Sequence, residues 1–168
     1  MIGTQLSVTR RNHALEHATM QILSSKYPGL RMAGYSTPQG FWLLGNLEIE
    51  ALQDAVEEAQ RRLRAGERKL AVHPHCGTNF AVSGLVGGVT AWLVMLGNGS
   101  RRSKLDRLPL LVTLVTLTLM LSAPLGPKAQ ERFTTDADLR DLHVVQIRTY
   151  VRSGMPAHFV STRDLPQG

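Results

Sequence analysis

Two long stretches without charge constrain the fold of this chain more than any other feature. No Asp, Glu, Lys or Arg occurs between Lys69 and Arg101, and none occurs from Leu108 to Pro127. Each stretch holds an apolar run of about 18–20 residues, which as a helix can cross a hydrocarbon layer of about 30 Å. The alternative is two buried core helices, which a domain this small rarely holds. We therefore predict a transmembrane helical hairpin over residues 79–127, with a short basic loop at 98–107.

The composition of the two runs refines this prediction. The second run is rich in Thr, Val and Leu over residues 111–118 and has high β-propensity. We still predict a helix there, because an isolated strand cannot satisfy its backbone hydrogen bonds in lipid. In the first run, Gly84 and Gly88 lie four residues apart and form a small-residue face that lets helices approach closely.

The polar parts of the chain, residues 1–78 and 128–168, predict an α+β metal-binding domain that the hairpin interrupts. The expected elements are a helix over 10–26 capped by Thr9, a β-hairpin over 30–45, an amphipathic helix over 47–65 capped by Asn46, a short strand over 69–72, a short helix over 133–141, and strands over 143–152 and 157–162. The last strands complete the domain after the hairpin.

Charge and composition narrow the partners and the location. The chain carries a formal charge of +6, and its basic residues cluster beside the apolar runs. This placement fits anionic lipid better than nucleic acid, for which no motif is present. We expect membrane lipid as a partner, leave open a homodimer or a subunit of a membrane complex, and expect no nucleic acid.

The first residues show no basic segment followed by an apolar one, and the single cysteine allows no internal disulfide. We therefore expect an integral protein of the inner or plasma membrane with its polar domain in the cytoplasm. Basic segments next to a span tend to lie in the cytoplasm, so the basic loop at 98–107 favours the opposite orientation. The segments next to the polar domain are about as basic, so the two tendencies roughly cancel.

The stretch H-A-L-E-H at residues 13–17 is the strongest chemical signal. On a helix, His13, Glu16 and His17 share one face. Two imidazoles one turn apart can bind one metal ion, and the carboxylate between them can move a proton. The only cysteine, Cys76, lies in a second group of metal-binding side chains, H-P-H-C-G-T at residues 73–78.

These residues predict a divalent metal site with His13, His17 and Cys76 as ligands. Two imidazoles and a thiolate suit zinc or ferrous iron, and three protein ligands leave a fourth position for water or substrate. Glu16 is then the catalytic acid or base. His73 and His75 are alternative ligands, and a site closed by one of them would be structural.

Neighbouring polar residues have two interpretations each. Asn12 and Thr78 either support the ligands by hydrogen bonds or serve as capping and turn residues. The hairpin side chains either line a pocket beside the metal or are core and turn residues; they are Tyr35, Ser36, Thr37 and Trp42.

The element order and motifs resemble the S-ribosylhomocysteine lyase (LuxS) family over about residues 10–80. The matching stretches are H-A-L-E-H at 13–17, G-F-W at 40–42 and C-G-T at 76–78. The resemblance implies a LuxS-like fold in which His13, His17 and Cys76 bind zinc or iron and Glu16 is the general acid/base. The stretches R-N-H-A-L-E-H-A-T and H-P-H-C-G-T-N also resemble an uncharacterised bacterial membrane-protein family.

The chain departs from the lyase pattern, because that family needs a second, catalytic cysteine just before its G-F-Y stretch. Residues 35–39 contain no cysteine, so the resemblance implies neither the thioether-cleaving reaction of the lyase nor its substrate for this chain. We predict a membrane-anchored, metal-dependent hydrolase or lyase with Glu16 as general base and an unknown substrate. The alternative is a non-enzymatic membrane subunit or assembly factor with a structural metal or none. A membrane peptidase, the weakest hypothesis, would need Glu131 or Asp136 as an acidic third ligand.

Overall fold

The computed structural model describes residues 2–96, 104–152 and 154–164, which form two compact units. The first, here called the α/β unit, comprises Met1–His73 and Glu131–Gly168, and the second, the hairpin unit, comprises Pro74–Gln130. The fold class is α+β, as the sequence predicts.

The α/β unit contains one antiparallel sheet of four strands in the order β1-β2-β4-β3. The strands are β1 (Ala33–Thr37), β2 (Gly40–Leu44), β3 (Leu142–Arg152) and β4 (Met155–Asp164). The predicted hairpin and both C-terminal strands are confirmed. The pairing places β4, the last of the described strands, in the interior of the sheet between β2 and β3.

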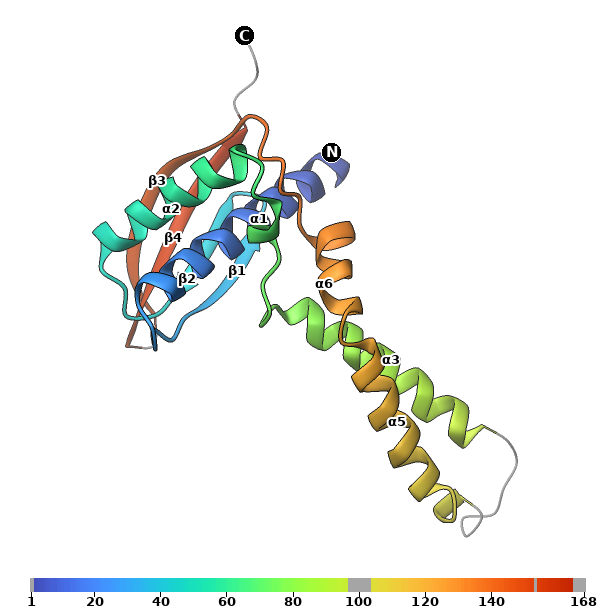
Figure 1. The fold of residues 1–168 in the computed structure, drawn as a ribbon. Coiled ribbons are helices and arrows are strands. Elements are labelled where there is room, and N and C mark those ends of the chain that lie inside the picture. Colours follow the sequence, from blue (N-terminus) through green and yellow to red (C-terminus); the bar gives the residue numbers. More distant parts are fainter. Residues whose placement is uncertain (1, 97–103, 153, 165–168) are drawn as a thin grey trace. The chain divides into compact units, whose positions relative to one another are not determined.

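Helices α1 (Ile2–Lys26) and α2 (Ile49–Arg64) lie together over one face of this sheet, as Figure 1 shows. Helix α2 buries one stripe at three- and four-residue spacing, made of Leu52, Ala55, Val56, Ala59 and Leu63. This stripe packs with buried apolar residues of α1 and of strands β2 and β4 to form the core.

The predicted caps of both helices are wrong. Helix α1 begins at Ile2, and the hydroxyl of Thr9 donates to the carbonyl of Gln5 inside the helix. The N-cap position of α2 is Glu48 rather than Asn46, and its side chain makes no capping bond. Thr9 thus bonds inside a longer helix instead of capping it, which a local pattern does not distinguish.

Two further elements differ from the prediction. The expected strand over 69–72 is a 3-10 helix, Arg68–Ala71, that packs against α1. The expected helix over 133–141 is a π-helical turn, Gln130–Thr134, followed by irregular chain. In both segments, backbone carbonyls bond to side chains of α1 instead of to a regular ladder.

The hairpin unit contains helices α3 (Gly77–Met95), α5 (Leu108–Ser122) and the short α6 (Leu125–Ala129). Helices α3 and α5 run side by side (Figure 1). Arg107 donates to the carbonyl of Leu96 at 2.9 Å near the connection between them. Most of the predicted basic loop, residues 97–103, lies outside the described residues.

One helix of the described chain, α3, is by itself long and apolar enough to cross a membrane. Helix α5 qualifies only together with the helical segment Leu125–Thr134, from which it is bent by 54°. The prediction of two helical runs is therefore confirmed, but length and composition support one continuous span rather than two.

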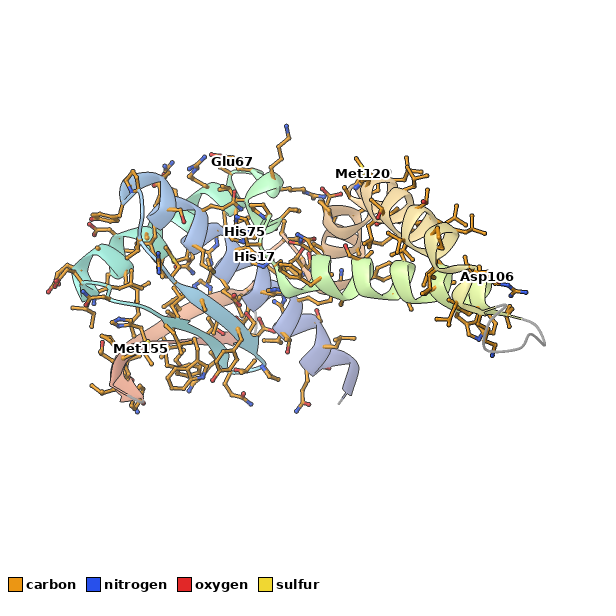
Figure 2. The ribbon with its side chains drawn as sticks, turned by 90° about the horizontal axis from the view of Figure 1, so that it is seen from below. His17, Glu67, His75, Asp106, Met120 and Met155 are labelled. Atoms are coloured by element: carbon orange, nitrogen blue, oxygen red, sulfur yellow. The ribbon has the colours of Figure 1, made fainter. Side chains whose placement is uncertain are left out.

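Apolar side chains of this unit are exposed within the structure. On α3 they include Leu85 and Trp92, which are 69% and 62% exposed, and on α5 Met120 and Leu121, at 70% and 80%. Met120 projects outward from α5 in Figure 2. These helices are therefore not core helices of their unit.

The close approach of the two helices occurs at Gly87 rather than at the predicted pair. A Cβ added at Gly87 would lie 3.3 Å from the Leu119 side chain, whereas Gly84 and Gly88 face open space. The small-residue face predicted at Gly84 and Gly88 is therefore not the face that contacts α5.

Candidate metal centre

Helix α1 presents the H-x-x-E-H motif on its inner face. Glu16 and His17 are buried and His13 is partly buried. The ring centroids of His13 and His17 are 4.2 Å apart, so the two imidazoles lie together as the helical spacing predicts. Figure 2 labels His17 on this helix.

Both imidazoles are oriented through their Nδ1 atoms. Nδ1 of His17 lies 2.7 Å from the carbonyl oxygen of Ala71, and Nδ1 of His13 lies 2.9 Å from that of Thr134. A carbonyl oxygen can only accept a hydrogen bond, so each Nδ1 carries the proton. Each Nε2 then keeps its lone pair, which is the tautomer that a metal ligand requires.

The carbonyl that orients His17 belongs to a segment held in place by Gln21, one turn further along α1. Nε2 of Gln21 donates to the carbonyls of Leu70 and Val72 at 2.8 and 2.9 Å. These two bonds flank Ala71 and fix the direction of its carbonyl. The 3-10 geometry of this segment is therefore part of the support of His17.

Arg10 supports His13 in a similar way. Its Nη2 donates to the carbonyls of Arg132 and Thr135 at 3.1 and 3.0 Å, on either side of Thr134. The backbone N–H of Asp136 also donates to the carbonyl of Arg10. Helix α1 thus supplies both histidines and the side chains that hold their carbonyl partners.

Cys76 follows this arrangement closely along the chain. The ring centroid of His73 lies 5.5 Å from that of His17, and three further residues reach at most about 11 Å. The ligand atoms of His13, His17 and Cys76 all lie within 4.8 Å of one another, so this group could hold a metal ion. Among the described residues, neither alternative histidine, His73 or His75, belongs to such a group.

The acidic residues that a peptidase-like site would need are likewise not part of the group. Glu131 and Asp136 lie in the segment that supports His13, but neither joins the described cluster of ligand atoms. The donor set is two imidazoles and one thiol, which suits zinc or ferrous iron better than a hard, oxygen-preferring cation.

The carboxylate of Glu16 is directed at strand β1. Its Oε2 accepts a hydrogen bond from the hydroxyl of Ser36 at 2.5 Å. A Cβ placed on Gly34 would overlap the end of the Glu16 side chain, so a larger residue there would force this carboxylate to move. Glu16 is therefore bonded to Ser36 and packs closely against Gly34.

The predicted supporting residues have separate roles. Asn12 is fully buried, donates to the carbonyl of Thr37 at 2.8 Å and accepts from the hydroxyl of Thr162 at 2.7 Å. It therefore connects α1 to strands β1 and β4 and is not a capping residue. The thiol of Cys76 lies 3.5 Å from the hydroxyl of Thr78.

The aromatic hairpin residues lie on the other face of the sheet. Trp42 stacks with Tyr35 and contacts Tyr150 and Phe159, with centroid distances of 4.8–6.3 Å. Because side chains alternate along a strand, this face is opposite to the one that Ser36 and Phe41 present to the helices. Of the predicted pocket residues, Ser36 reaches Glu16, while Tyr35 and Trp42 do not face the motif.

Two structural residues were missed by the sequence analysis, Gln21 and Arg10. Gln21 lies four residues after His17, on the same helical face, and this spacing is the one signal that could have identified it. Nothing local marks Arg10, because its partners are more than 120 residues away in the chain.

Fold and site together define an α+β protein with an apolar helical hairpin and a group of side chains that could hold a metal ion. The chain belongs to the family described as a domain of unknown function, DUF6391, whose model matches residues 8–147. An uncharacterised protein from Picosynechococcus sp. is 37% identical over 174 residues, which cover 95% of this chain and 81% of the relative. No solved structure matches the chain.

Proposed function

We propose that the protein is a membrane-anchored, metal-dependent hydrolase or lyase in which His13, His17 and Cys76 bind one zinc or ferrous ion. The observations that carry this proposal are the grouping of the three ligand atoms within 4.8 Å of one another and the pair of Nδ1–carbonyl bonds, which put the proton of each imidazole on Nδ1 and the metal-binding lone pair on Nε2. Three protein ligands leave a coordination position for substrate or water, which is the catalytic pattern.

Glu16 is the proton-transferring group in this proposal. A bound metal ion supplies Lewis acidity at the reacting group. The Glu16 carboxylate takes up and returns a proton there, and Ser36 holds it in one orientation. Its short spacing from both histidines keeps the base beside the ligands.

The LuxS resemblance supports the ligand set and the role of Glu16, but not the reaction. The chain has a single cysteine, so the thiol that thioether cleavage needs is missing. The proposed reaction class is therefore hydrolysis or elimination on a different substrate.

Membrane anchoring through α3 and α5 is the second part of the proposal. The apolar side chains of both helices are exposed within their unit, and a hydrocarbon layer would remove them from water. We place the α/β unit on the cytoplasmic side, as the sequence analysis expects.

A non-enzymatic membrane subunit or assembly factor is the second candidate function. The observation that favours it is the closeness of the His73 ring to His17, 5.5 Å between centroids. A fourth ligand from His73 would close the site and make the metal structural.

The test is metal content per chain of detergent-purified protein, measured by mass spectrometry. We expect near-stoichiometric zinc or iron in wild type, loss of the metal in Cys76→Ser and His17→Ala, and full retention in Glu16→Gln. His143→Ala removes a histidine of strand β3 and serves as the matched control. Loss of metal in His73→Ala as well would favour the structural site. Metal-free wild type purified without chelator would contradict the enzyme and favour the non-enzymatic subunit without a metal.

A further inference from the structure

A cavity of about 410 Å³ lies within the α/β unit, beside the segments that orient the two histidines. Ala71 and Thr135 contribute to its lining, but none of the three proposed metal ligands does. The cavity is therefore a separate feature from the metal centre.

Charged side chains of both signs surround this cavity. Three lining residues, here called the cationic wall, are basic: Arg10, Arg68 and Lys69. Three others, here called the acidic wall, are Glu131, Asp136 and Asp138. Among the described residues, the ion pairs include none between these two walls, and Asp138 alone is paired elsewhere, with Arg140 at 3.6 Å. The lining thus offers charges of both signs that do not form ion pairs with each other in the described part of the chain.

One buried donor of Arg10 has no acceptor in the described part of the chain. Its Nη2 is bonded to two carbonyls, but its Nε–H is buried without a protein partner. A buried guanidinium N–H without an acceptor is unfavourable, and an oxygen from a ligand would satisfy it.

We propose that this cavity binds a phosphoethanolamine group, with the phosphate at the cationic wall and the ammonium at the acidic wall. Guanidinium and ammonium groups form charge-assisted bonds with phosphate oxygens. Carboxylates in turn accept the three N–H donors of a primary ammonium. A ligand with a single sign of charge would pair with one of the two walls only.

The source of this group is a lipid headgroup or a small soluble molecule. Each wall includes a residue that is close along the chain to the hairpin unit. Glu131 follows the end of α6 by two residues, and Lys69 precedes α3 by eight. Eight residues reach at most about 28 Å, so an inserted hairpin keeps the cavity within reach of the headgroup layer. The lipid source rests on the proposed membrane anchoring, whereas the soluble source does not.

The test is a calorimetric titration of delipidated, detergent-purified full-length protein with four probes. They are dihexanoyl phosphatidylethanolamine, phosphatidylcholine, phosphatidylglycerol and glycerophosphoethanolamine. We expect one saturable site for phosphatidylethanolamine and about tenfold weaker binding of phosphatidylcholine, whose methylated nitrogen has no N–H to donate. Phosphatidylglycerol, which lacks the ammonium, should be weaker by a similar factor.

Glycerophosphoethanolamine separates the two sources. Binding as tight as that of the short-chain lipid supports a soluble ligand, and binding more than tenfold weaker supports a lipid headgroup.

Exposed wall residues provide variants that keep the fold. The double variant Arg68→Gln/Lys69→Gln should lower the phosphatidylethanolamine affinity about tenfold or more, and Glu131→Gln should remove its preference over phosphatidylcholine. The double variant Lys26→Gln/Arg31→Gln removes the same charge from exposed residues outside the cavity and is the matched control.

Three results would overturn the proposal: no saturable binding, an equal loss in the control, or phosphatidylglycerol binding at least as tightly as phosphatidylethanolamine. Metal content measured on the same samples separates this outcome from the proposed function. Lipid binding without metal contradicts the enzyme alone, and metal without lipid binding contradicts the cavity alone.

Discussion

Helices α1 and α3 both lack the one-sided apolar stripe of an ordinary surface helix, but in opposite ways. Helix α1 buries polar residues, among them Asn12, Glu16 and His17. Helix α3 exposes apolar ones, among them Leu85 and Trp92. Buried polar groups cost free energy unless they are hydrogen-bonded, and those of α1 have specific partners. The buried polar residues of α1 are thus stabilised by hydrogen bonds within the protein, whereas the apolar residues of α3 remain exposed within their unit.

The largest effect is expected from a charge placed on α3. Leu85→Arg should disfavour membrane insertion by about 3 kcal/mol, more than a hundredfold, because Arg is costly and Leu favourable at the centre of a span. The measurement is the fraction of protein that stays in the membrane pellet after alkaline extraction. Leu6→Arg, at a similarly exposed position of α1, is the control and should change nothing. A Leu85→Arg protein that becomes soluble and folded without detergent would show that α3 faces water.

The second prediction tests the space reserved for Glu16. Gly34→Ala should destabilise the α/β unit by about 1–3 kcal/mol, because its Cβ would overlap the Glu16 carboxylate. The shorter side chain in Gly34→Ala/Glu16→Asp should recover part of this loss, as a double-mutant cycle of thermal unfolding measures. Gly3→Ala, whose Cβ meets open space, is the control. Additive losses in the cycle would mean that Gly34 and Glu16 are independent.

A smaller effect is expected from the support of His17. Gln21→Leu should weaken metal affinity about tenfold, or about 1.4 kcal/mol, at unchanged stoichiometry, because the Ala71 carbonyl loses its flanking bonds. Competition with a chromogenic chelator measures the affinity. Gln53→Leu, on the exposed face of α2, is the control. Unchanged affinity in Gln21→Leu would reduce Gln21 to a packing role.

The smallest effect concerns another buried polar residue, His158 on β4. Burial lowers the pKa of His158 below its ordinary value of 6.5. The unfolded chain therefore binds a proton that the folded chain does not, so the free energy of unfolding falls as the pH drops below about 6.5. The slope is at most about 1.4 kcal/mol per pH unit. Urea unfolding between pH 5 and 7 should show a flatter slope for His158→Gln, whereas an unchanged slope would assign the effect to other groups. His143→Gln, on the exposed side of β3, should match wild type.

The sequence predicted the elements whose signals are local. The H-x-x-E-H spacing, the β-hairpin, the amphipathic stripe of α2 and the apolar helices all follow from periodicity and turn residues within about twenty positions. The pairing of His13 with His17 also follows, since one helical turn separates them.

The parts that sequence reasoning missed depend on contacts between distant segments. Residues 69–72 have the alternating pattern of a strand. Their carbonyl groups instead accept hydrogen bonds from the side chains of Gln21 and His17, and the segment forms a 3-10 helix. The partner of His13, Thr134, is 121 residues away, and no local pattern indicates it. No local pattern indicates the role of Ser36 either, because its bond to Glu16 forms only when the β1–β2 hairpin folds back onto α1.

The interior position of β4 sets the order in which this protein can be completed during synthesis. Strand β2 pairs with β4, and Asn12 bonds to Thr162 of β4, so neither the pairing of β2 nor the bonding of Asn12 is complete until β4 has been made. His13 likewise acquires its orientation only once Thr134 has emerged. The whole hairpin unit leaves the ribosome earlier, and at about 5–20 residues per second its synthesis takes several seconds. The apolar helices could therefore enter a membrane while the sheet is still incomplete. A metal ion that needs both oriented histidines would bind after Thr134 has emerged.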